Sequence, residues 1–280
     1  MNRNLEDAIN LQTIFIAANV ALSLVVLLYA SWSDYKTREV SNRVWAVYAP
    51  IALILSLAEL LLYDPSKLPL FGLSFGLTAA IAFALFYSGG FGGADSKALM
   101  CIALALPFST EALFKPLLAS GVSPMSQVLF PLTIFSNAVL FAAASGIYMF
   151  FRNIFWNVRH GRKIFEGSLA AESWGKKILV LITGYKVSVA VLQAKWHVYP
   201  MEDVADDGGN PPKRKLVVVP RDEGRSEIVE RLSSAVENGK INDFVWATPG
   251  LPMLIFVTAG LIVSVFFGDI VWLLVSFILG

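Results

Sequence analysis

The sequence has a single cysteine, two histidines and a charged fraction of only 15% over 280 residues. One cysteine excludes an intrachain disulfide and any zinc site built from paired cysteines, and we interpret Cys101 as a small packing residue in an apolar helix. The two histidines, His160 and His197, lie far apart in the sequence, so we expect neither a metal site nor a cofactor. The net charge of +1 gives no indication of a nucleic-acid partner, and we expect none.

Apolar residues, in contrast, make up 56% of the chain, and the mean hydropathy is +0.64. Soluble domains contain about 45–50% apolar and about 25% charged residues. The excess is concentrated in blocks long enough for a helix to cross a bilayer, which takes about 20 residues. The sequence therefore predicts an α-helical polytopic membrane protein surrounded by a lipid bilayer.

About six transmembrane helices are predicted from these blocks. The fourth is short because it stops at Pro107, and Asp269 interrupts the sixth. We expect Asp269 to end the last span, with residues 270–279 lying on the outer leaflet or re-entering it. The six predicted segments are 11–32, 44–63, 70–87, 98–108, 128–151 and 251–279.

Residues 152–250 are polar enough to form a water-soluble domain. We therefore divide the chain into a transmembrane catalytic domain (1–151), a soluble domain (152–250) and a C-terminal transmembrane helix (251–280).

A small α+β fold is predicted for the soluble domain. The β-prone runs 187–189, 196–199 and 216–219 indicate strands, and the spacing of apolar residues over 226–237 indicates an amphipathic helix. We interpret the acidic segment 202–207 as a solvated loop.

The basic residues indicate how the chain is oriented. All but three of the 22 lysines and arginines, namely Arg3, Lys67 and Lys115, fall in the first loop, the glycine-rich loop or residues 152–250. Because cytoplasmic loops carry an excess of basic residues, we place these three segments in the cytoplasm. This orientation puts the soluble domain on the cytoplasmic side and both termini outside.

Two aspartates occupy the same predicted membrane face. Asp34 follows the first span, and Asp95 follows Gly89-Gly90-Phe91-Gly92-Gly93-Ala94 and opens the fourth. Two carboxyl groups at one depth can share a proton, so that one activates a water as general base while the other donates to a scissile carbonyl. The helix N-terminus favours an anion at Asp95. The glycines permit close approach of an extended substrate, although a flexible hinge would explain them equally well.

These motifs resemble those of the type IV prepilin peptidases, a family of GxGD-class aspartyl proteases, and most of all the archaeal preflagellin and prepilin peptidases. In that family a turn similar to Val40-Ser41-Asn42 follows the first aspartate, and a box similar to Gly92-Gly93-Ala94-Asp95 ends on the second. Ala94 stands at the second glycine of the box and Ser41 at a proline. A positive φ at Ala94 would be strained.

The resemblance implies that Asp34 and Asp95 are catalytic. It implies as substrates the precursors of pilins or archaellins, which carry a short basic leader before an apolar helix and are cut on the cytoplasmic side of the cell membrane. Bacterial relatives often carry a cysteine-rich zinc segment, which this chain lacks. The candidates for binding substrate or supporting the loop are Asn42, Gly92, Gly93, Ala94, Lys97, Pro249, Gly250 and Leu251.

Two other functions remain open from the sequence. One is a protease of the presenilin or signal-peptide-peptidase kind, because Pro249-Gly250-Leu251 before the last helix is similar to the Pro-Ala-Leu motif of presenilins. The other is a transporter that uses Asp34 and Asp95 for ions. Placement of both acids at one face disfavours transport, since a conduction path needs polar groups at mid-membrane depth.

Overall fold

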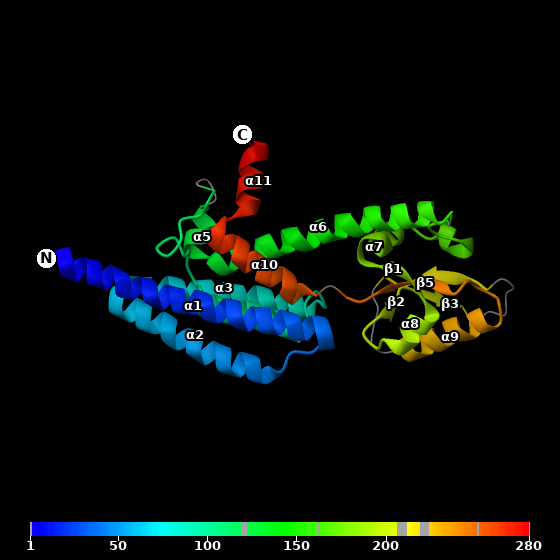
Figure 1. Cartoon of the computed structure of the whole chain (residues 1–280), viewed down its shortest axis with the longest axis horizontal. Coiled ribbons are helices and arrows are strands. Elements are labelled where there is room, and N and C mark those ends of the chain that lie inside the picture. Colours follow the sequence, from blue (N-terminus) through cyan, green and yellow to red (C-terminus); the bar gives the residue numbers. More distant parts are fainter. Residues whose placement is uncertain are drawn as a thin grey trace. The chain divides into compact units, whose positions relative to one another are not determined.

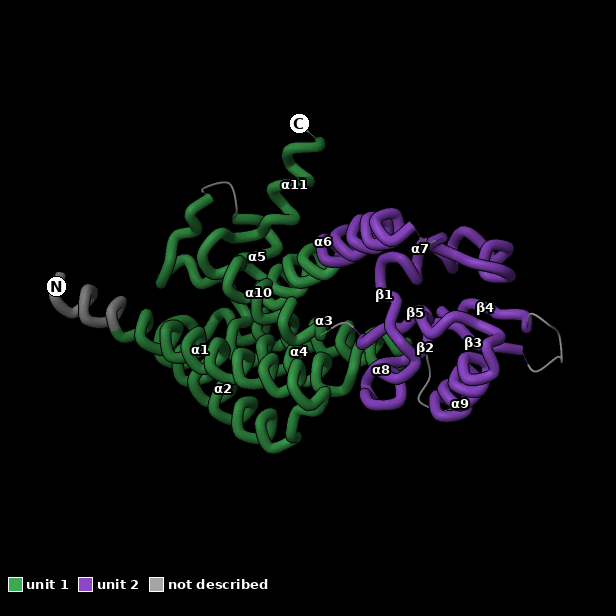
Figure 2. Tube along the Cα trace, turned by 45° about the vertical axis from the view of Figure 1, so that its right-hand side comes forward, with its two compact units in different colours: residues 1–142, 252–280 green, residues 143–251 purple. Residues whose placement is uncertain are grey.

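The computed structural model describes residues 2–118, 122–161, 163–205, 212–218, 224–250 and 252–279. The chain forms two compact units, one of residues 1–142 with 252–280 and one of residues 143–251, which are coloured separately in Figure 2. The long helix α6 belongs partly to each.

The first unit consists of helices. Figure 1 shows α1 and α2 running alongside each other, with α3 and α10 in the same bundle. The elements are α1 (Asn2–Thr37), α2 (Asn42–Tyr63), η1 (Pro65–Lys67), α3 (Leu68–Tyr87), α4 (Gly93–Ala105), α5 (Pro124–Val128), the start of α6 (Phe130–Arg159), α10 (Met253–Phe266) and α11 (Ile270–Leu279).

Within the described residues, four helices are long and apolar enough to cross a membrane: Leu11–Thr37, Asn42–Tyr63, Pro65–Tyr87 and Phe130–Arg159. The pair α10 and α11, bent by 70°, counts as a fifth if it is one span. The predicted fourth span corresponds to α4, whose 13 residues rise only about 20 Å against a hydrocarbon core of about 30 Å. The membrane fold is confirmed, and the count of six stays a prediction.

Hydrogen bonds between side chains join the helices of the first unit. Asn19 Nδ2 of α1 donates to Ser56 Oγ of α2 at 3.1 Å, and the hydroxyls of Ser31 and Thr258 join α1 to α10 at 2.8 Å. Asn137 Nδ2 of α6 donates to a serine of α10 at 2.9 Å. Apolar packing gives little preference for helix over lipid, so such bonds help to decide which helices meet.

The bend between α10 and α11 is built around Asp269, which is 2% exposed. Its carboxylate accepts the backbone N–H of Trp272 at 2.9 Å and the hydroxyl of Ser123 at 2.7 Å. Gly268 adopts φ +88° just before it. Asp269 is therefore the N-cap of α11, and its carboxylate satisfies backbone groups that would otherwise lie unpaired at the break.

The second unit surrounds a three-stranded antiparallel sheet of order β1-β5-β2 and a two-stranded sheet of β3 and β4. Val187 of β1 pairs with Val245 of β5, and both are buried. The elements are the end of α6, η2 (Gly167–Ala171), α7 (Trp174–Thr183), β1 (Tyr185–Ser188), α8 (Val189–Ala194), β2 (Tyr199–Pro200), β3 (Glu202–Val204), β4 (Arg214–Leu216), α9 (Arg225–Glu237) and β5 (Phe244–Thr248).

The local predictions for this unit succeed for the helix and only partly for the strands. Helix α9 confirms the helix predicted over 226–237. The strand predicted over 187–189 ends one residue early, because Val189 opens α8 with its N–H held by Asp243. The central strand β5 was not predicted, because its apolar residues stand just before the last apolar segment and do not form a separate pattern.

The interpretation of segment 202–207 as a solvated loop is wrong for its first three residues, which form β3; residues 206 and 207 lie outside the described part. Glu202 is fully buried, where it pairs with Arg214 and accepts the backbone N–H of Trp246 at 2.7 Å. Asp203 binds Arg231 at 3.0 Å. Burial raises the pKa of Glu202, although the charge of Arg214 opposes that shift.

The contact between α6 and α10 generates a prediction. A methyl group on Gly260 would collide with the carbonyl oxygen of Ile134 and lie 2.9 Å from the amide nitrogen of Ala138. We expect Gly260→Ala to force the helices apart and to destabilise the unit by about 1–3 kcal/mol. The melting temperature of the detergent-solubilised protein should fall. Gly72→Ala is the matched control, because nothing lies within 4 Å of its added carbon; equal melting temperatures for the two variants would contradict the prediction.

Candidate active site

Asp34 lies half-buried in the last turn of α1, just before the loop that leads to α2. Its backbone carbonyl accepts the N–H of Arg38 at 2.9 Å. Arg38 adopts φ +58°, a left-handed conformation that ends the helix and that no other described residue except glycine adopts. The hydroxyls of Ser33 and Thr37 both donate to the carbonyl of Glu39, at 2.8 and 3.1 Å. The short loop is therefore tied back onto the turn that carries Asp34.

Asp95 lies in the first turn of α4. Its Oδ2 accepts the backbone N–H of Gly92 at 3.1 Å, so the carboxylate caps its own helix. A side chain at position 92 would begin 3.1 Å from the same oxygen, which explains a glycine there. Ala94 is helical, so the substitution in the glycine box introduces no strain; the left-handed glycine of this loop is Gly89, at φ +76°.

Helix α4 begins with the partly buried Asp95 and continues into the interior of the bundle. It packs against α1, α2, α3 and α10, and Ala98, Leu99, Cys101 and Ile102 are buried among them. This burial raises the pKa of Asp95 to about 6; the N–H of Gly92 opposes the shift, and the negative charge of Asp34 adds to it. Burial thus outweighs the stabilisation of an anion expected at a helix N-terminus.

A side-chain bond joins the two sequence motifs. The ammonium of Lys97, two residues after Asp95, donates to Oδ1 of Asn42 at 2.7 Å. Asn42 is the first residue of α2, and Ser41 before it is the N-cap whose hydroxyl oxygen accepts the N–H of Arg43. Ser41 therefore occupies the position expected for proline and begins the helix by capping it.

The remaining predicted residues belong to the second unit or lie outside the described part. Pro249 and Gly250 follow β5, and Gly250, at φ +73°, donates its N–H to the hydroxyl of Thr248 at 3.2 Å. Leu251 lies outside the described residues. Their predicted role stays a prediction.

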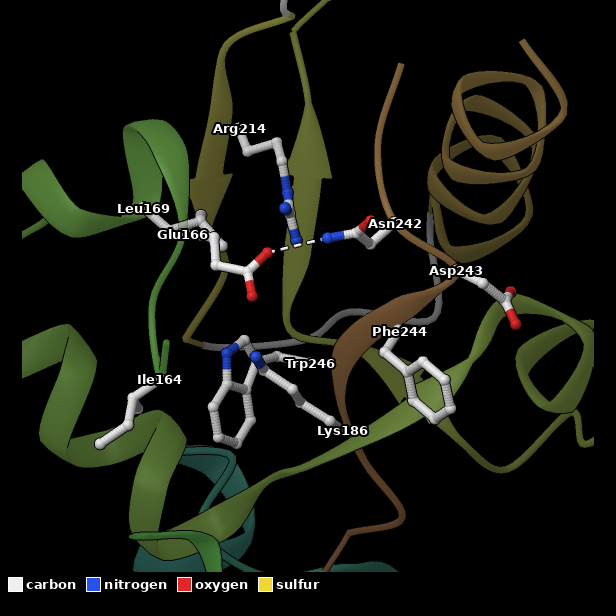
Figure 3. A pocket seen from close by; sticks show the side chains of 9 residues that line it. All are labelled: Ile164, Glu166, Leu169, Lys186, Arg214, Asn242, Asp243, Phe244 and Trp246. Carbon is white, nitrogen blue, oxygen red and sulfur yellow. Dashed lines mark hydrogen bonds between the residues drawn. The ribbon is translucent and has the colours of Figure 1, made fainter. Parts of the chain in front are cut away.

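The second unit contains a cavity of about 300 Å³, shown in Figure 3. Its charged side chains already have partners within the protein. Glu166 accepts a hydrogen bond from Asn242 at 3.0 Å, and the ammonium of Lys186 lies over the ring of Trp246. Arg214 pairs with Glu202. Asp243 points away from the other lining groups and accepts the N–H of Val189 at 3.1 Å. These groups hold the sheets and loops of this unit together, so we assign the cavity no chemistry.

The first unit therefore defines a class, that of polytopic helical membrane proteins with one aspartate at the end of the first helix and a second in the first turn of a short helix packed inside the bundle. Residues 21–151 match the model of the type IV leader peptidase family, and residues 176–270 match that of the archaeal peptidase A24 C-terminus type II. These matches confirm the resemblance recognised in the motifs, and the chain is a protease.

Similar proteins occur in three archaea. A preflagellin peptidase of Methanococcus voltae is 28% identical over 260 residues, which cover 89% of this chain and 94% of the relative. Preflagellin peptidases of Methanococcus maripaludis and Methanocaldococcus jannaschii are each 23% identical, over 87% and 90% of this chain and 92% and 94% of the relatives.

The raised pKa of Asp95 predicts a pH-dependent stability. The folded state binds this proton more tightly than the unfolded state. The contribution of Asp95 to the stability of the protein is therefore greatest below pH 3.8 and falls as the pH rises to about 6. Asp95→Asn is neutral at every pH. We expect its melting temperature to exceed that of the natural protein at pH 7.5 and the difference to shrink towards pH 4.

Asp64→Asn is the control for this measurement. Hydrogen bonds from Ser66 and Lys67 lower the pKa of Asp64, so its ionised form is the one that the fold favours. This substitution should not raise the melting temperature at pH 7.5. A pH-independent difference between Asp95→Asn and the natural protein would contradict the assignment.

Proposed function

We propose that this protease removes the short basic leader from precursors of pilins or archaellins, using Asp34 and Asp95 as its catalytic pair at the cytoplasmic membrane face. The observation that carries the proposal is the link between the two motifs: Lys97, two residues after Asp95, donates a hydrogen bond to Asn42 after the loop that follows Asp34, and the charge of Asp34 adds to the raised pKa of Asp95. Such coupling is what a pair needs to hold one proton between two carboxyl groups.

The reaction requires different roles from the two acids. Burial and the neighbouring negative charge favour the proton on Asp95, which then donates to the oxygen of the scissile carbonyl. Asp34 accepts a proton from a water whose oxygen attacks the carbonyl carbon. As the tetrahedral intermediate breaks down, Asp34 gives the proton it took from water to the departing amine, the C–N bond opens, and the hydroxyl formed from the carbonyl oxygen returns its proton to Asp95. One product ends in the new carboxylate of the leader, and the other begins with the new amine of the mature protein.

The proposed substrate follows from the relatives and from the glycine loop. The similar archaeal proteins are preflagellin peptidases. Gly92, Gly93 and Ala94 place almost no side-chain bulk beside Asp95, so an extended peptide segment has room to approach its carboxyl group. The apolar helix that follows the cleavage point in such precursors would remain in the lipid.

The cytoplasmic location rests on the charge distribution. Lys36, Arg38 and Arg43 flank the turn after Asp34, and Lys97 follows Asp95, so both acids lie beside basic residues. An excess of basic residues near membrane helices favours the cytoplasmic side. The matches to the leader peptidase family do not favour the two alternatives, intramembrane cleavage of the presenilin kind and ion transport.

Substitution of the two acids tests the catalytic assignment. In membranes mixed with a prepilin-like precursor, Asp34→Asn and Asp95→Asn should each abolish cleavage, because neither amide can exchange the required proton. Glu39→Gln is the matched control, an exposed acid in the same loop whose backbone carbonyl and not its side chain makes the loop's hydrogen bonds. Cleavage near the natural rate by either aspartate variant would refute the pair.

Cysteine labelling tests the orientation. With Cys101 buried in the bundle, a cysteine placed at the exposed Glu227 should react with an impermeant maleimide only from the cytoplasmic side. A cysteine at the exposed Lys115 should react only from outside. The opposite pattern would overturn the proposed side of cleavage while leaving the catalytic pair untouched.

A further inference from the structure

The bond between Lys97 and Asn42 joins segments that are 55 residues apart in the sequence. One segment runs from Asp34 through the loop to the start of α2, and the other is the first turn of α4 with Asp95. The two segments are distant in the sequence and meet only through the fold. The 2.7 Å contact between the ammonium and the amide oxygen therefore links the loop that follows Asp34 directly to the helical turn that holds Asp95.

The loop that follows Asp34 is held by internal hydrogen bonds. The N–H of Arg38 binds the carbonyl of Asp34, and the hydroxyls of Ser33 and Thr37 bind the carbonyl of Glu39. A loop tied in this way transmits a displacement of Asn42 back to Asp34. On the other side, Lys97 and Asp95 belong to one helical turn, so they move together.

Among the described residues, the loop itself makes few other contacts with α4, although α1 and α2 on either side of it pack against that helix. The side chains of residues 35–37, 39 and 41–43 are exposed, and only Val40 and Val44 pack against the core of the bundle. Apolar contacts of this kind limit how far the loop can leave the bundle but tolerate small shifts, whereas a charged hydrogen bond has a narrow range of length and direction. The Lys97–Asn42 bond is thus the directional contact between the two motifs.

We infer that Lys97 is a positioning residue that acts through Asn42 to hold Asp34 and Asp95 within reach of each other. Its consequence for catalysis rests on the proposed function, whereas its effect on the separation of the two positions does not. The competing explanation is that Lys97 acts only as a positive charge beside Asp95. In that case Asn42 would have no part in it.

Cross-linking tests the separation without relying on activity. Cysteines replace Asp34 and Asp95 in a full-length chain that also carries Cys101→Ala, and a short bis-maleimide joins them in membranes. We expect the cross-linked fraction to fall several-fold when Lys97→Met or Asn42→Ala is added. An unchanged fraction in both would overturn the inference. Lys36→Met, which removes an exposed lysine that lies over Trp32, is the control and should leave the fraction unchanged.

A double-mutant cycle tests the same bond in catalysis. With a prepilin-like precursor, Lys97→Met and Asn42→Ala should each lower kcat about tenfold or more with little change in KM, and the double variant should be no slower than either. Asn42→Asp, which keeps an acceptor oxygen, should recover most of the loss, but not when Lys97→Met is present. Full activity of Asn42→Ala, or losses that multiply in the double variant, would overturn the inference.

The cleavage assay of the aspartate variants and the cross-linking distinguish failure of the catalytic pair from failure of the positioning role. If Asp34→Asn and Asp95→Asn still cleave, the catalytic pair is wrong, yet the cross-linking result still decides whether Lys97 and Asn42 hold these positions together. If the aspartate variants are inactive while cross-linking is insensitive to Lys97→Met and Asn42→Ala, the pair stands and the positioning role fails. Melting temperatures of all variants show whether a loss of kcat reflects unfolding.

Discussion

The enclosure of α4 by α1, α2, α3 and α10 is the packing on which the site depends. This short helix places Asp95 where it is partly buried, and that partial loss of water raises the pKa of a carboxyl group that would otherwise be ionised. The neighbouring charge of Asp34 reinforces the effect. A carboxyl placed at the end of a longer, lipid-facing helix would remain hydrated and would hold its proton only in acid.

Specific contacts hold several helices of this unit in place. Asn19 and Ser56 bind α1 to α2, Ser31 and Thr258 bind α1 to α10, and Gly260 lets α10 approach α6 closely. Hydrogen bonds and close backbone approach are the interactions that distinguish a helix from lipid, where apolar burial alone does not. The catalytic geometry thus depends on a few polar and small residues in an otherwise uniform apolar bundle.

The second unit follows the rules of a water-soluble domain. Its smaller sheet contains a buried ion pair, that of Glu202 in β3 with Arg214 in β4, and removal of one partner would leave an unpaired charge in the core. Sequence patterns predicted helix α9 from its apolar spacing. They could not reveal that Glu202 and Asp203 are buried, because an acidic run looks solvated until its distant arginines are brought alongside.

The sequence by itself determined the membrane class, the helix boundaries near Tyr63 and Tyr87 and the resemblance to the type IV leader peptidases, because bilayer thickness and short motifs are local properties. Tertiary structure alone decided two matters: that burial outweighs the helix dipole at Asp95, and that Lys97 meets Asn42. Each depends on residues far apart in the chain, and no local pattern records how far apart they lie in the fold.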